Sequence, residues 1–98
     1  MSDEFEYYMS EINAVCGKID REMAKLSTGK CNYDLCDGLF KESEIAMKSA
    51  MIEARMADSD EEKKKMLASV EELKSTLVAQ KKKLNSSRLM AGSSGLGM

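Results

Sequence analysis

The chain has 98 residues and a net charge of −2; 43% of its residues are apolar, 33% charged and 5% aromatic, and it has no Pro, Trp or His. This length favours one domain with a modest core, and the low content of β-branched and aromatic residues excludes an all-β fold. The absence of a basic excess argues against nucleic acid as the main partner.

Apolar residues recur at helical spacing in three stretches, which two short polar breaks separate. Steps of three and four residues place each set along one side of a helix. The sequence therefore predicts an all-α fold, an antiparallel up-down-up three-helix bundle with helices at about residues 3–26, 34–57 and 60–89. The positions expected to face the core are Phe5, Tyr8, Met9, Ile12, Val15, Cys16, Ile19, Met23 and Leu26, then Cys36, Leu39, Phe40, Ser43, Met47, Ala50, Met51 and Ala54, then Met66, Leu67, Val70, Leu73, Leu77, Gln80 and Leu84.

The first predicted helix begins with three acidic residues, which the positive end of the helix dipole favours. Tyr7 and Tyr8 are adjacent and point about 100° apart, so Tyr8 joins the apolar stripe and Tyr7 lies at its edge. An exposed Tyr is a good interface anchor, and partial packing is the alternative interpretation of Tyr7. For Gly17, inside the helix, we expect close approach of a neighbouring helix, with a tolerated surface Gly as the alternative.

Cap residues mark the two breaks. Gly29 suits a left-handed C-terminal cap, and Asn32 or Asp34 is positioned to cap the second helix. In the second break, Ser59 and Glu62 form an S-x-x-E capping box. Because so few residues separate the second and third helices, these two must be antiparallel neighbours.

The end of the second predicted helix is apolar on more than one face. Ile52 and Met56 lie beside the core stripe there, and we expect them to flank a groove between helices. Together with Tyr7 they are the candidate partner-binding residues. The tail at residues 91–98 is rich in Gly and Ser, which predicts a flexible linker after a bundle spanning residues 1–90.

The residues that carry enzyme chemistry do not form a recognisable set. Without His, the Ser-His-Asp and Cys-His arrangements are excluded. Cys16, Cys31 and Cys36 fit no metal-binding spacing, and the glycines fit no phosphate-binding loop. We therefore predict a protein that is not an enzyme and has no catalytic, cofactor-binding or metal-binding residues.

The basic runs at residues 63–65 and 81–83 share their predicted helix with several acids, which indicates a solvated face. The alternative is a weak contact with an acidic protein or an anionic membrane surface. No signal peptide and no apolar run of about 20 residues, the length that spans a bilayer, is visible. The odd number of cysteines fits a reducing compartment.

Two segments resemble the N-terminal domain of the Vti family of vesicle transport v-SNAREs. The opening SDEFEYY at residues 2–8 is similar to that family's S-x-x-F-E-x-Y-like start, and KKKLNSSR at residues 81–88 is similar to the end of its third helix. The resemblance covers about residues 2–90, and the phase of the three stripes agrees with it.

The resemblance implies a non-catalytic, Habc-like regulatory domain that acts in transport between Golgi and endosomes, at the cytoplasmic face of those membranes. It implies binding to an epsin-type ENTH-domain adaptor. Binding to other SNAREs, and to the membrane, would use a C-terminal SNARE motif and anchor that are absent from these 98 residues. We expect the isolated domain to be monomeric and not to bind nucleic acid.

Two other interpretations remain open from the residues alone. The chain is also compatible with a structural helical bundle or coiled-coil assembly module unrelated to SNAREs. A helical regulator of an enzyme or of a nucleic-acid partner, in contact through its lysine runs, is the second.

Overall fold

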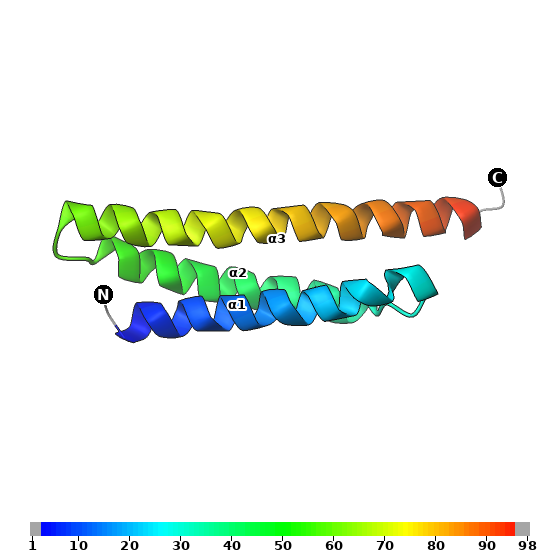
Figure 1. Ribbon diagram of the computed structural model, residues 1–98, viewed down its shortest axis with the longest axis horizontal. Helices are drawn as coiled ribbons and strands as arrows, with labels where there is room; N and C mark the ends of the chain where they lie inside the picture. Colours follow the sequence, from blue (N-terminus) through cyan, green and yellow to red (C-terminus); the bar gives the residue numbers. More distant parts are fainter. Residues whose placement is uncertain (1–2, 96–98) are drawn as a thin grey trace.

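A computed structural model describes the backbone of residues 3–95 and the side chains of residues 3–90. Over this range the chain forms the helices α1 (Asp3–Met23), α2 (Tyr33–Arg55) and α3 (Asp60–Gly95), with a short 3₁₀ helix, η1 (Ala24–Thr28), after α1. Figure 1 shows the chain reversing direction at each connection, so that α2 runs against both of its neighbours. The predicted all-α three-helix bundle is confirmed.

The core is built from the predicted stripes. Its most deeply buried large side chains include Phe5, Ile12 and Ile19 of α1 and Met66, Val70 and Leu84 of α3. On α2 the small residues Ala46, Ala50 and Ala54 are buried, and α1 and α2 pack against each other along their length. Small side chains permit such close contact because the side chains at the interface set the distance between helix axes.

The helix ends differ from the predicted bounds by a few residues. The α-helical part of the first helix ends at Met23, and η1 continues the chain to Thr28. Gly29 then adopts φ 73°, the left-handed cap conformation predicted for it. Asn32 is the residue that caps α2, because its side chain accepts a hydrogen bond from the Leu35 N–H at 3.0 Å.

The third helix begins as predicted and runs further. The Ser59 hydroxyl accepts the Glu62 N–H at 3.1 Å, as in the predicted capping box. α3 continues to Gly95, so residues 91–95 of the predicted linker are helical, and the rest of that linker lies outside the described residues. A Cβ added at Gly17 would meet only its own helix neighbour Arg21, at 3.9 Å, so the predicted close approach of another helix to Gly17 is wrong.

Among the described residues, side-chain hydrogen bonds join α3 to its neighbours at two points. Gln80 of α3 is buried, and its Nε2 donates to the Cys16 carbonyl oxygen (3.2 Å) and to Asp20 Oδ1 (2.7 Å) of α1. Arg88 of α3 donates to Asp37 of α2 at 3.2 Å. These contacts fix the register of α3 against both neighbours.

A third polar contact closes the connection between α1 and α2. Glu22 is buried, and its two carboxylate oxygens accept the Asn32 N–H (2.8 Å) and the Lys25 ammonium (3.1 Å). The Asn32 hydrogen bond, followed by that of Lys25, holds the pKa of Glu22 below its usual value. Glu22 therefore ties the start of α2 to the end of α1 as a carboxylate.

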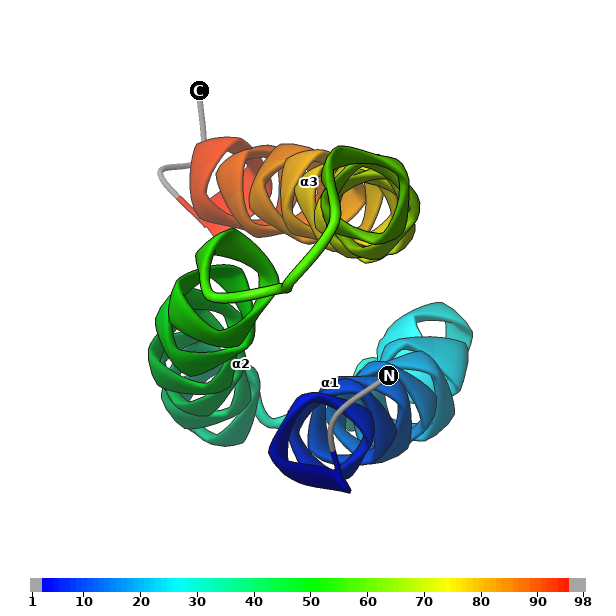
Figure 2. The ribbon, with the colours of Figure 1, turned by 90° about the vertical axis from the view of Figure 1, so that its left-hand side faces the viewer.

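Seen from its end, the bundle is asymmetric. Figure 2 shows α2 beside both α1 and α3, whereas α1 and α3 stand further apart. The molecule is a rod of 57 × 19 × 17 Å. Among the described residues, none of the helices contains an apolar stretch long enough to cross a bilayer.

Candidate protein-docking groove

A groove with an apolar floor lies between α2 and α3. Its volume is about 180 Å³. Each helix contributes about two turns, with the same spacing of three, one and three residues, so the two walls match in length. The lining residues are Phe40, Ser43, Glu44 and Met47 of α2 and Lys74, Leu77, Val78 and Lys81 of α3.

The floor of the groove is closed to hydrogen bonding. Phe40 and Leu77 are buried, and the hydroxyl of the fully buried Ser43 donates to the Phe40 carbonyl oxygen at 2.7 Å. Because the one polar side chain of the floor is already paired, the floor offers an entering group apolar contact. Val78 is 47% exposed and extends this apolar surface to the rim.

A lysine stands over the mouth. The Lys81 ammonium lies 5.9 Å from the centre of the Phe40 ring and 3.9 Å from Glu44 Oε1. Both contacts are long, and the Lys81 and Glu44 side chains are exposed; exposed ion pairs contribute less than about 1 kcal/mol. The Lys81 ammonium is therefore free to turn towards a carboxylate on an arriving molecule at little cost.

The dimensions of the groove decide what it can receive. Small-molecule and cofactor sites usually occupy about 300–1,000 Å³, which is larger than this groove. A cavity of about 150 Å³ is enough for one benzene ring. The groove therefore fits a single large aliphatic or aromatic side chain, the kind of anchor found at protein interfaces.

A second depression, between α1 and α3, has a different character. Its lining includes the polar side chains of Asn13, Ser69 and Thr76. Met9 and Leu73 supply its apolar lining, and its volume of about 440 Å³ is larger than one side chain fills.

The two buried thiols, Cys16 and Cys36, are not activated nucleophiles. Burial, followed by the nearby Asp20 carboxylate, raises the pKa of Cys16. Burial, followed by the Cys31 thiol, raises the pKa of Cys36 to about 11. Both thiols are therefore protonated at neutral pH, whereas the reactive form is the thiolate. No three His, Cys, Asp or Glu side chains among the described residues are grouped to hold a metal ion.

The three residues singled out from the sequence are all exposed: Tyr7 is 59%, Ile52 56% and Met56 67% exposed. Ile52 and Met56 lie one turn apart on α2, and neither lines the groove. Tyr7 belongs to α1, where its ring contacts that of Tyr8 edge to face at 5.5 Å. Only Ile52 and Met56 are thus brought onto one surface.

The groove residues Val78 and Lys81 were not predicted as a site from the sequence. Lys81 belongs to the basic run at residues 81–83, which the sequence predicts to be a solvated face, and Val78 is not on the core stripe. A signal was nevertheless present, because Val78 directly follows the core residue Leu77 and widens the apolar stripe of α3 on one side. Comparison of the chain with protein-family profiles, curated proteins and solved structures gave no match.

Proposed function

We propose that residues 3–90 form the N-terminal docking domain of a Vti-like v-SNARE. In this proposal the domain catalyses nothing and binds an epsin-type ENTH adaptor during transport between Golgi and endosomes. The observation that carries the proposal is the groove between α2 and α3, an apolar pocket of side-chain size with a lysine over its mouth.

The resembling segments have structural roles that agree with the proposal. Phe5 of the opening segment is 2% exposed and anchors the start of α1 in the core, and Tyr8 packs partly against it. In the second segment, Leu84 is fully buried and Arg88 forms the ion pair with Asp37. These residues support the likeness to a family of three-helix bundles, whereas the adaptor's contact is proposed from the groove alone.

Docking would use the two properties of the groove together. An apolar side chain of the adaptor enters between Phe40 and Leu77, and a neighbouring carboxylate of the adaptor takes the place of Glu44 beside Lys81. The apolar contact supplies affinity because it removes surface from water. The charge contact supplies orientation and a salt-dependent association rate.

Isothermal titration calorimetry of the chain with a purified ENTH domain tests the proposal. We expect binding that weakens by about tenfold, or 1.4 kcal/mol, when Val78→Arg blocks the groove and when Lys81→Glu reverses the charge at its mouth. Both side chains are exposed, so neither substitution should unfold the bundle.

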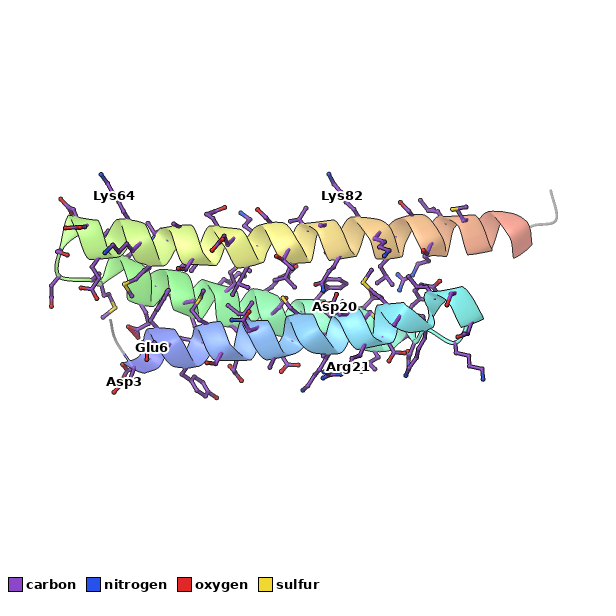
Figure 3. The ribbon with its side chains drawn as sticks, in the orientation of Figure 1. Asp3, Glu6, Asp20, Arg21, Lys64 and Lys82 are labelled. Atoms are coloured by element: carbon purple, nitrogen blue, oxygen red, sulfur yellow. The ribbon has the colours of Figure 1, made fainter. Side chains whose placement is uncertain are left out.

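The matched control is Lys82→Glu, which makes the same charge change one residue away. Figure 3 shows the Lys82 side chain pointing away from α1 and α2. Its variant should bind the adaptor as the unaltered chain does. Absence of binding at high micromolar concentration, or equal losses in the Lys81 and Lys82 variants, would count against the proposal.

A further inference from the structure

α2 carries a second apolar surface on the side that faces away from the bundle. Ile45 is 69% exposed, Ile52 56% and Met56 67%. Steps of seven and four residues place these three side chains along one line of the helix, which we call the outer stripe. At 3.6 residues per turn this line is about half a turn from the buried line that contains Cys36, Ser43 and Ala50.

A row of cations runs along one edge of the outer stripe. Lys41, Lys48 and Arg55 are exposed and follow one another at intervals of seven residues, the repeat of a coiled coil. Among the described residues, none of the three has an ion-pair partner within 4.0 Å. We call these residues the basic row. Glu44 lies beside the row, three residues after Lys41 and four before Lys48, but its ion pair is with Lys81 of α3.

The opposite edge of the stripe is acidic. Glu42 and Glu53 lie there, about a third of a turn or more from the basic row. The outer face of α2 therefore has an apolar seam, one basic edge and one acidic edge. In coiled coils, flanking charges of this kind select the partner helix.

We propose that the outer stripe of α2 binds an amphipathic helix of another protein, which lays apolar residues on the stripe and acidic residues along the basic row. The proposal rests on the exposed apolar and charged side chains of α2 and not on the proposed function. It predicts a partner of coiled-coil type, with an aliphatic seam and carboxylates at intervals of seven residues.

A second copy of this chain fits the surface poorly. In an isologous antiparallel pair the same edges meet, so the basic row would face itself. In a parallel pair the basic row would meet the opposite edge, where Leu39 and Ala46 are buried in the core and only the two carboxylates of Glu42 and Glu53 face three cations. Charge complementarity therefore favours a different, acidic helix.

A membrane fits less well than a helix for a related reason. Helices that lie on anionic bilayers carry basic residues along their polar face. Here the acidic edge with Glu42 and Glu53 would be held against the lipid head groups and repelled by them. A protein helix accommodates both edges because its two sides can differ.

The test uses two synthetic peptides of equal length, which have Leu at both seam positions of each heptad. One carries Glu at both flanking positions and the other carries Lys. Fluorescence anisotropy with the labelled peptides should show that the chain binds the Glu peptide at least about tenfold more tightly than the Lys peptide. The variant Ile52→Ser should weaken binding of the Glu peptide by a similar factor.

Charge reversal makes the test specific. In the triple variant Lys41→Glu, Lys48→Glu, Arg55→Glu we expect the preference to invert, so that the Lys peptide binds more tightly. The matched control is the double variant Lys64→Glu, Lys82→Glu, whose side chains point away from α2 (Figure 3), and it should keep the original preference. Val78→Arg should leave peptide binding unchanged, which separates this surface from the groove.

Three outcomes would overturn the inference. The first is equal binding of the two peptides, or none at high micromolar concentration. The second is concentration-dependent dimers of the chain in sedimentation that Ile52→Ser abolishes. The third is binding to vesicles of phosphatidylserine and phosphatidylcholine that the triple variant abolishes while peptide binding is absent.

Discussion

Replacing Gln80 by Leu should make the bundle more stable, although it removes two hydrogen bonds. Gln80 is 7% exposed, and its Nε2 donates to the Cys16 carbonyl oxygen and to Asp20 Oδ1 of α1. Its Oε1 is buried and has no hydrogen-bond donor among the described protein groups. A buried acceptor that lacks a donor costs about 1–3 kcal/mol.

The two hydrogen bonds lost in Gln80→Leu leave partners that are easily satisfied. The Cys16 carbonyl lies inside α1 and keeps its helical hydrogen bond, and Asp20 is exposed, so its carboxylate returns to water. The bond to the Cys16 carbonyl therefore contributes about 0.5–1 kcal/mol, and the bond to the exposed Asp20 carboxylate about 1.5 kcal/mol, the low end for a charged acceptor. With the apolar contact that Leu adds, we expect a net stabilisation of about 1 kcal/mol, or a rise in Tm of about 4–8 °C.

Gln80→Glu provides the contrasting change at the same position. The introduced carboxylate cannot donate to Asp20 and repels it, so we expect a loss of about 2 kcal/mol at neutral pH. The loss should shrink as the pH falls, because protonation restores a donor. Urea unfolding followed by circular dichroism measures both variants. If Gln80→Leu is less stable than the original chain by about 1 kcal/mol or more, the reasoning about Oε1 is refuted.

Three further predictions concern the caps and the cysteines. Ser59→Ala removes the cap that accepts the Glu62 N–H and should lower the free energy of unfolding by about 1 kcal/mol in urea titrations. Because the folded-state pKa of Glu22 lies below its ordinary value of 4.5, its stabilising contribution is present at neutral pH and lost as the pH falls through the folded-state pKa. The difference in urea midpoint between the original chain and Glu22→Gln should therefore be present at pH 7 and shrink as the pH falls below 4.5, and a constant difference would contradict this. Iodoacetamide at neutral pH should label the half-exposed Cys31 before the buried Cys36, whose pKa is about 11, as mass spectrometry of peptides will show; the reverse order would contradict the burial argument.

The sequence predicted the core well because burial follows a simple period. Residues such as Ile12 and Leu84 stand on the predicted stripes and are fully buried. Their burial required only that three amphipathic helices cover one another. The cap at Gly29 was also predictable, because a residue with positive φ after a helix is usually glycine.

The end of α3 was less predictable because local and cooperative effects oppose each other. Gly92 and Gly95 disfavour a helix by about 1 kcal/mol each, and for that reason the segment resembled a linker. Extending an existing helix costs far less than starting one, however, and no Pro interrupts α3. The Gly and Ser content of residues 91–95 disfavours starting a helix there, but it does not prevent the extension of the helix that precedes them.

The candidate surfaces were harder to predict than the core because each depends on how helices meet. The groove needs Phe40 and Val78 from different helices, and the register of α2 against α3 is not encoded in either stripe alone. Ile45 stands half a turn from the core stripe, so a search for one buried face per helix passes over it. Ile52 and Met56 were predicted as partner-binding residues because they cluster at the end of a helix.

Both proposed surfaces include exposed side chains, and substitutions of these side chains allow binding to be separated from folding. Substitutions at exposed positions such as Val78, Lys81 and Ile52 usually change the free energy of unfolding by less than about 0.5 kcal/mol. Core substitutions such as Ile12→Ala cost about 2–5 kcal/mol and would weaken every interaction of the domain together. A variant that loses one partner, keeps the other and unfolds at the same urea concentration therefore locates an interface. If every surface variant lost binding and stability in parallel, neither surface would be a docking site, because loss of the fold alone would explain the loss of binding.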